Sequence, residues 1–182
     1  RRGIRERLGS YAEGFVDKLR GRTVIWIHAV SVGETRAAAP LFRALRERYP
    51  DAVLLLSHVT ETGREVALKV AEVDHCIFFP FDLSWVTRRV LRRIRPAVVV
   101  LVETEIWPNF VRAAHEQGVP VILVNGRISD RSLPRYRLAG KLLRPVLAGL
   151  TAFCMHNRLD ERLDQEVAWT RKVVAAAQQL GT

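Results

Sequence analysis

Six consecutive apolar residues, from Ala97 to Val102, constrain the fold of this chain more than any other segment. Four of the six are valines, whose branched side chains favour extended backbone. A strand without alternating polar residues is typical of a parallel sheet that is covered on both faces. The segment therefore predicts a buried strand in an α/β fold.

Short apolar runs alternate with amphipathic segments along the rest of the chain. Strands are predicted over residues 23–30, 52–56, 75–79, 97–102, 119–124 and 150–155. Helices are predicted over residues 35–48, 61–71, 83–94 and 107–116, with further helical segments over 129–147 and from 158 to about 180. This alternation is typical of βαβ units and predicts a Rossmann-like, doubly wound parallel sheet.

The composition narrows the class of protein. The 182 residues, 48% of them hydrophobic, suit one globular domain, or one domain with a small addition. No apolar run reaches the roughly 20 residues that a bilayer span requires. Cys76 and Cys154 have no metal-ligand spacing, so we expect no metal site and a reducing compartment. The net charge of +10 predicts an anionic partner, which could be nucleic acid, a phosphorylated substrate or a membrane surface.

Ligands of doubly wound folds bind beyond the carboxyl ends of the strands. Ser31, Gly33 and Glu34 follow the first predicted strand, and Gly33 is expected to permit a tight turn there. At a helix N-terminus, Glu34 is either a general base aimed into the cleft or a helix-capping carboxylate. His28 and His58 end two strands, where single histidines are more often structural than catalytic.

Hydroxyl groups and a glycine follow the second predicted strand. Thr60, Thr62 and Gly63 suit the binding of a phosphate or a sugar hydroxyl, although an ordinary helix N-cap is the more common arrangement. The segment matches neither the GxxxxGK[ST] nor the GxGxxG spacing of nucleotide-binding loops. After the third strand, Asp82 is predicted to cap the helix that follows it.

Two acids directly follow the apolar run of residues 97–102. Glu103 and Glu105 would be costly to bury unless they are hydrogen-bonded or functional. Asn109 lies a few residues further on, in the first turn of the next predicted helix. The alternative is that both acids simply hold arginines in a loop.

The fifth predicted strand is followed by an amide and a series of basic residues. Asn125 could donate to a ligand oxygen, and Arg127 could clamp a carboxylate or phosphate. Arg131 continues this basic run, which favours an anion-binding role. A pairing of Arg127 with Glu103 or Glu105 is the structural alternative.

Together these motifs closely resemble the N-terminal domain of 3-deoxy-D-manno-oct-2-ulosonic acid (Kdo) transferases, bacterial enzymes that glycosylate lipid A. The motifs occur in the family's order and cover roughly residues 3–163. The matching segments are Gly3-Ile4-Arg5-Glu6-Arg7-Leu8-Gly9, His28-Ala29-Val30-Ser31-Val32-Gly33-Glu34-Thr35, Thr60-Glu61-Thr62-Gly63, Pro80-Phe81-Asp82, Glu103-Thr104-Glu105-Ile106-Trp107-Pro108-Asn109 and Asn125-Gly126-Arg127-Ile128-Ser129.

The resemblance implies the N-terminal half of a GT-B glycosyltransferase, which receives a lipid A precursor as acceptor while a C-terminal half binds the donor, CMP-Kdo. It implies an inverting reaction that needs neither a metal nor a cofactor. Glu34 falls on the family's general base, and Glu103 and Glu105 fall on its second acidic motif. Residues 31, 33, 60, 62, 63, 109, 125, 127 and 131 are accordingly expected to bind the acceptor.

The resemblance also suggests how the chain is divided. We expect an acceptor-binding domain over residues 1–163 and a C-terminal helix over 164–182, which is either the parent enzyme's terminal helix or an appended tail. The family's membrane anchor and donor-binding domain are expected to be missing. The chain alone should then be soluble and inactive, whereas its parent would work at the cytoplasmic face of the bacterial inner membrane.

A stand-alone Rossmann-like module that binds a polyanion or nucleic acid is the alternative. It would account for the positive charge. It would not account for the acids that follow the first and fourth strands, because these would repel phosphates, and no recognisable nucleic-acid motif is present. We therefore expect an anionic membrane surface rather than nucleic acid as the partner.

Overall fold

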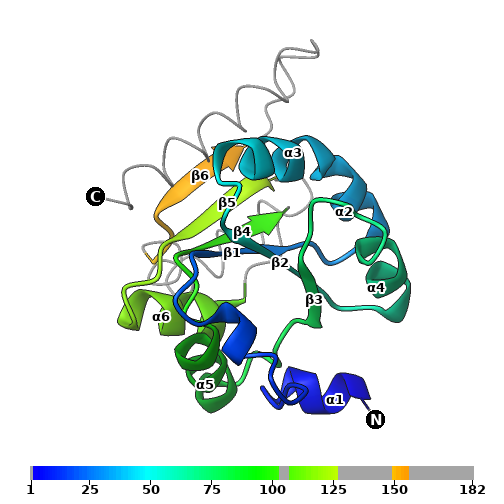
Figure 1. The fold of residues 1–182 in the computed structure, drawn as a ribbon. Helices are drawn as coiled ribbons and strands as arrows, with labels where there is room; N and C mark the ends of the chain where they lie inside the picture. Colours follow the sequence, from blue (N-terminus) through cyan, green and yellow to red (C-terminus); the bar gives the residue numbers. More distant parts are fainter. Residues whose placement is uncertain (1, 103–106, 127–148, 156–182) are drawn as a thin grey trace.

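A six-stranded parallel sheet forms the centre of the computed structural model, which describes residues 2–102, 107–126 and 149–155 (Figure 1). Its strand order is β3-β2-β1-β4-β5-β6, and every pair of neighbours is parallel. The strands are β1 (Val24–His28), β2 (Val53–His58), β3 (His75–Phe78), β4 (Val98–Val102), β5 (Val121–Gly126) and β6 (Ala152–Met155). The predicted doubly wound sheet is thus confirmed.

The strand order reverses between β1 and β4. From β1 the chain builds outward through β2 to β3, and it then returns to the other side of β1 to build β4, β5 and β6. Ile25 of β1 is consequently in register with Leu54 of β2 and also with Val98 of β4. In such a sheet the crevice beyond the carboxyl ends of the two strands at the reversal is the usual ligand position.

Helices cover both faces of the sheet (Figure 1). The α3 and α4 helices pack on one face, while α5, α6 and the segment before β1 pack on the other. The helical elements are α1 (Arg2–Arg7), η1 (Asp17–Leu19), α2 (Val32–Ala37), α3 (Ala39–Arg48), α4 (Glu61–Ala67), α5 (Ser84–Ile94) and α6 (Pro108–Glu116).

The helix predicted over residues 35–48 is in fact two helices. α2 ends at Ala37, and α3 begins at Ala39 with Pro40 in its first turn. Proline has no N–H group to continue the hydrogen bonds of a preceding helix, but it suits the start of a new one. The predicted helical segments over 129–147 and 158–180 lie outside the described residues.

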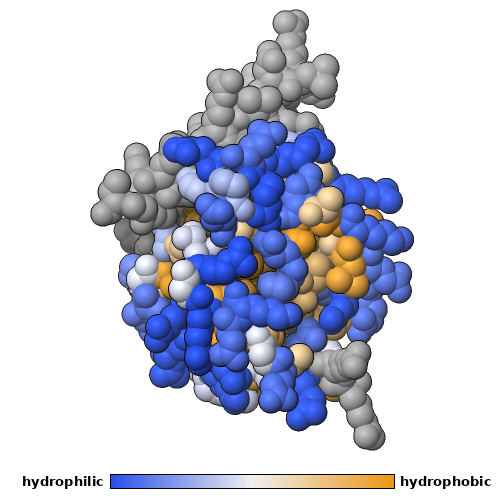
Figure 2. Space-filling view, viewed as in Figure 1, coloured by the Kyte–Doolittle hydropathy of each residue, from blue (hydrophilic) through white to orange (hydrophobic). Residues whose placement is uncertain are grey.

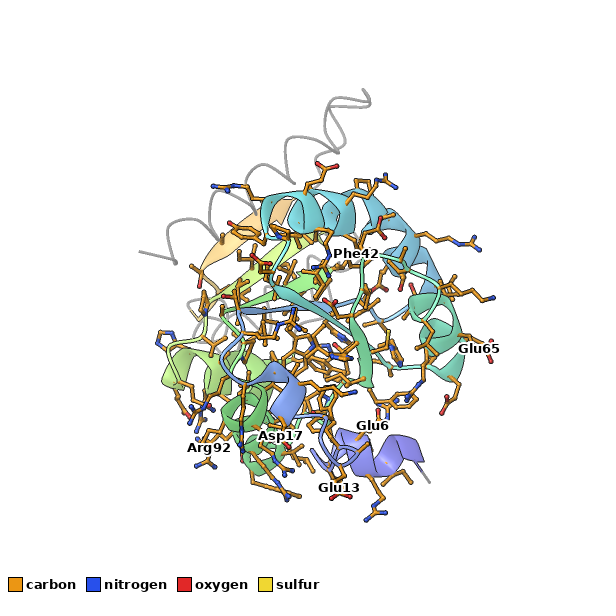
Figure 3. The ribbon with its side chains drawn as sticks, in the orientation of Figure 1. Glu6, Glu13, Asp17, Phe42, Glu65 and Arg92 are labelled. Atoms are coloured by element: carbon orange, nitrogen blue, oxygen red, sulfur yellow. The ribbon has the colours of Figure 1, made fainter. Side chains whose placement is uncertain are left out.

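The strands at the reversal are buried on both faces. All five residues of β4 are at most 3% exposed, which confirms the prediction from its apolar sequence. On one face Trp26 of β1 meets Phe110 of α6 edge to face, with ring centroids 5.2 Å apart. On the other face Phe42 of α3 is fully buried; Figure 3 labels it between α3 and the sheet.

The outer surface is mainly polar. Figure 2 shows a predominantly hydrophilic face, with a smaller gathering of hydrophobic residues near β3 and α4. Among the described residues, no helix is both long enough and apolar enough to span a membrane.

Candidate active site

Glu34 lies in the first turn of α2, just beyond the carboxyl end of β1. Its side chain is buried, and both of its oxygens accept hydrogen bonds: Oε2 from the Val30 backbone N–H at 2.6 Å and Oε1 from the Ser31 hydroxyl at 2.9 Å. Ser31 is the N-cap of α2, and its Oγ accepts from the Glu34 N–H at 3.2 Å. This reciprocal arrangement is close to a capping box.

The geometry therefore shows directly that Glu34 takes part in the N-terminal cap of α2. It does not exclude a role as a base, because a carboxylate that accepts hydrogen bonds can still take up a proton. Gly33 lies inside the helix without a positive φ, so the predicted tight turn at this position is wrong. The absence of a side chain at exposed Gly33 instead leaves the start of α2 uncovered.

The turn between β2 and α4 lies beside this first turn. Thr60 is the N-cap of α4, and its Oγ1 accepts from the Gly63 N–H at 3.0 Å, as an ordinary N-cap does. The exposed hydroxyl of Thr62 is 3.2 Å from that of Thr60. A Cβ atom on Gly63 would lie 3.0 Å from Thr60 Oγ1 and 3.6 Å from the carbonyl oxygen of Val30. Gly63 thus allows the two turns to approach each other closely.

Glu6 and Arg7 attach α1 to the same edge of the sheet, a role that the sequence did not reveal. The Arg7 guanidinium donates to the carbonyl oxygen of Val59 and lies over the ring of Phe78, 4.9 Å from its centroid. Glu6 pairs with Arg64 of α4 at 3.3 Å and accepts from the Phe78 N–H at 3.1 Å. The only signal in the sequence was the position of these residues in a family-like motif.

His28 and His58 are buried at the ends of β1 and β2. Nδ1 of His28 is 3.1 Å from the Ser57 carbonyl oxygen, and the ring stacks on Phe79 with centroids 3.8 Å apart. Burial, with a smaller contribution from the charge of nearby Arg7, lowers the pKa of His28 to about 3 and that of His58 to about 4. Both rings are therefore neutral at neutral pH.

Asp82 caps α6 and not α5, so the predicted cap is wrong. Its Oδ1 accepts from the Phe110 N–H at 2.7 Å, and its Oδ2 accepts from the Asn109 N–H at 3.1 Å. The N-cap of α5 is Leu83, which makes no side-chain capping bond. The α5 and α6 helices pack side by side, which brings the residue before α5 to the start of α6. The Asn109 amide, predicted to bind acceptor, donates to the Asp82 carbonyl oxygen at 2.7 Å.

The remaining predicted site residues are not all within the described part of the chain. Glu103, Glu105, Arg127 and Arg131 lie outside it, as does the side chain of Asn125, whose backbone belongs to β5. Among the described residues, no three His, Cys, Asp or Glu side chains are grouped so that they could hold a metal ion.

A doubly wound parallel sheet, with a buried carboxylate just beyond its strand-order reversal, defines a Rossmann-like α/β domain. Residues 2–180 match the family described as 3-deoxy-D-manno-octulosonic-acid transferase (kdotransferase). The chain belongs to this family.

Individual relatives agree with this assignment. The chain is 44% identical over 133 residues to the 3-deoxy-D-manno-octulosonic acid transferase of Bordetella pertussis, a match that covers 69% of this chain and 30% of the relative. It is 36% identical over 146 residues to a bifunctional glycosyltransferase/methyltransferase of Fusobacterium nucleatum, covering 79% of this chain and 23% of that protein. The matched region thus spans less than a third of either relative.

Among solved structures, the glycosyl transferase family 9 protein from Veillonella parvula has a similar fold. The TM-score is 0.51 at 14% sequence identity, and the match covers 83% of this chain and 41% of that one. At this identity the likeness concerns the fold alone.

Proposed function

We propose that this chain is the acceptor-binding domain of an inverting GT-B glycosyltransferase that transfers Kdo from CMP-Kdo to a lipid A precursor in lipopolysaccharide biosynthesis. The observation that carries the proposal is Glu34, a buried and doubly hydrogen-bonded carboxylate at the strand-order reversal. The proposed transfer of Kdo is supported by the membership of the chain in the Kdo transferase family. We assign the binding site for CMP-Kdo to the region of the longer relatives that lies outside their match to this chain.

In the proposed reaction, a hydroxyl oxygen of the acceptor attacks the anomeric carbon of Kdo from the side opposite the CMP phosphate. The bond from that carbon to the phosphate oxygen breaks, and CMP leaves with the bonding electron pair. Glu34 takes the proton of the attacking hydroxyl, which makes that oxygen a stronger nucleophile. The configuration at the anomeric carbon is inverted, and no metal or cofactor is assigned a part.

The remaining residues are assigned to binding and positioning. Glu103 and Glu105 would position substrate or basic side chains. Among the described acceptor-binding candidates, Ser31, Thr60 and Thr62 are exposed residues with hydroxyl side chains, and Gly33 leaves room for the acceptor at the start of α2. The other acceptor-binding residues of the proposal are Gly63, Asn109, Asn125, Arg127 and Arg131.

We further propose that the parent enzyme works at the anionic cytoplasmic surface of the bacterial inner membrane. Large apolar side chains are exposed around α1 and the start of α5: Ile4 is 57% exposed and Trp85 is 55% exposed. Tryptophan is enriched at membrane interfaces, and the net charge of +10 favours an anionic surface.

The decisive experiment replaces Glu34 by glutamine in the enzyme that carries this domain. Glutamine at this position still completes a capping box, so α2 should remain capped while the base is lost. We expect kcat for Kdo transfer from CMP-Kdo to a lipid A precursor to fall by at least about 100-fold, with an unchanged melting temperature.

Glu65→Gln is the matched control, since Glu65 is an exposed glutamate on α4 (Figure 3). That variant should transfer Kdo at the parent rate. If Glu34→Gln also keeps the parent kcat, Glu34 is only a cap and the proposed role as a base is wrong.

A further inference from the structure

A second polar site lies at the opposite edge of the sheet from Glu34. A pocket of about 660 Å³ lies between the segment that joins α1 to β1 and the last turn of α5. That segment leads into the start of β1, and α5 leads into the start of β4, so the pocket is near the amino ends of the strands. In Figure 3, Glu13, Asp17 and Arg92 mark this region, away from α2 and α4.

The charged lining of the pocket is predominantly basic. Arg20, Arg92, Arg93 and Arg95 contribute guanidinium groups, against the carboxylates of Glu13 and Asp17. Arg20 and Asp17 form an ion pair at 3.3 Å that is largely exposed. Such a pair is weak, and it neutralises one charge of each sign. Three arginines therefore face one remaining acid, Glu13.

These three arginines retain hydrogen-bond donors that the described part of the chain does not use. Arg93 Nη1 donates to the Gly9 carbonyl oxygen at 2.7 Å, and Arg92 Nε donates to the Arg88 carbonyl oxygen at 3.3 Å. The guanidinium of Arg95 makes no hydrogen bond or ion pair with a described residue. A guanidinium carries five N–H donors, so most of the donors of these three arginines are left for solvent or a ligand.

A buried hydroxyl group is also left without a partner beside the arginines. Tyr11 lines the pocket, and its hydroxyl is buried without a hydrogen-bond partner among the described residues. Burial raises the pKa of this phenol, so it remains protonated and can act as a donor. Leaving a buried hydroxyl unsatisfied is costly, and a small shift of the Tyr11 ring toward the pocket would let a bound acceptor group remove that cost.

We propose that this pocket binds a phosphate ester, whose phosphate is held by Arg92, Arg93 and Arg95. The planar fork of arginine matches phosphate oxygens in pairs, which is why arginine predominates in such sites. The volume is in the range of small-molecule pockets and far exceeds one phosphate, so the organic part of the ester would fill the remainder. A soluble sugar phosphate and a phospholipid headgroup share this chemistry.

The test compares two double variants with the same change in charge. Arg92→Gln/Arg95→Gln alters the pocket, while Arg36→Gln/Arg43→Gln alters exposed arginines on α2 and α3 and serves as the control. In one arm, titration calorimetry measures binding of glucose 6-phosphate, with glucose as the uncharged comparison. In the other arm, co-sedimentation measures binding to phosphatidylglycerol vesicles, with phosphatidylcholine vesicles as the comparison.

We expect the pocket variant to bind at least one phosphate-bearing probe about tenfold or more weakly than the control variant, since two charged donors are lost. The arm that shows this difference identifies the source of the ester. Tyr11→Phe should also weaken binding without lowering the melting temperature, because it removes an unsatisfied hydroxyl. If the two double variants bind both probes equally, the proposal is wrong.

Discussion

Glu34 shows how one side chain can serve the fold and the proposed chemistry together. The Ser31 side chain caps α2 by accepting from the Glu34 N–H, while the bonds from the Val30 N–H and the Ser31 hydroxyl hold the carboxylate in one orientation. A base is most effective when its position is set before the substrate arrives. The two interpretations that the sequence left open are therefore compatible, and only a variant that keeps the cap while removing the base can separate them.

The buried histidines make stability depend on pH. The folded chain holds His58 neutral with a pKa near 4, whereas the unfolded chain binds a proton near pH 6.5. The unfolded state therefore binds more protons between these values, and the free energy of unfolding falls as the pH is lowered from about 6.5 to about 4. His28, with a pKa near 3, acts in the same direction.

His58→Gln should flatten this dependence. Removing one such group lowers the slope by up to about 1.4 kcal/mol per pH unit within that window. Urea unfolding between pH 7 and pH 4 measures the slope. His115→Gln, at an exposed position on α6, should keep the parent slope, and an equally steep slope in the His58 variant would contradict the prediction.

The contact between α5 and α6 depends on a residue that belongs to neither helix. Asp82 precedes α5 but accepts hydrogen bonds from the first N–H groups of α6, and its backbone carbonyl accepts from the Asn109 amide. These N–H groups have no partner within their own helix. The cap therefore holds the start of α6, which comes immediately after the segment that carries Glu103 and Glu105 in the sequence.

Asp82→Ala should destabilise the chain by about 1–2 kcal/mol, because two N–H groups lose their acceptor. Urea unfolding at pH 7 measures this loss. Asp82→Asn keeps one side-chain oxygen and should lie between the parent and the alanine variant. Asp51→Ala, at an exposed aspartate, should change the free energy of unfolding by no more than about 0.5 kcal/mol. Equal effects at both positions would exclude the capping role.

At the scale of the whole molecule, local sequence patterns predicted the parallel sheet but not the side-chain contacts that attach α1 to α4 and cap α6. Burial of β4 on both faces could be predicted because every residue of the strand is apolar. The sequence of α1 has one large apolar residue, Ile4, so it offers no periodicity. The pairing of Glu6 with Arg64 and the cap from Asp82 to α6 join residues far apart in sequence, and no local signal shows which residue each of them pairs with.

The two core layers should behave as one folding unit, because the same strands contribute alternate residues to both. Phe42→Ala empties one layer and Phe110→Ala the other, and each removes a fully buried ring. We expect each variant to lose about 3–5 kcal/mol and still unfold in a single transition. Calorimetry that resolved two transitions in either variant would show that the layers are independent.

The attachment of α1 has a mechanical consequence. Arg7 holds the Val59 carbonyl and Glu6 holds Arg64, so the first helix is anchored to the turn that carries Thr60 and Thr62, away from the amino ends of the strands. A force on the chain ahead of α1 would act on that turn and, through the bond from the Phe78 N–H to Glu6, on the end of β3 as well. The exposed residues Thr60 and Thr62 therefore lie on one of the two segments that would carry this force.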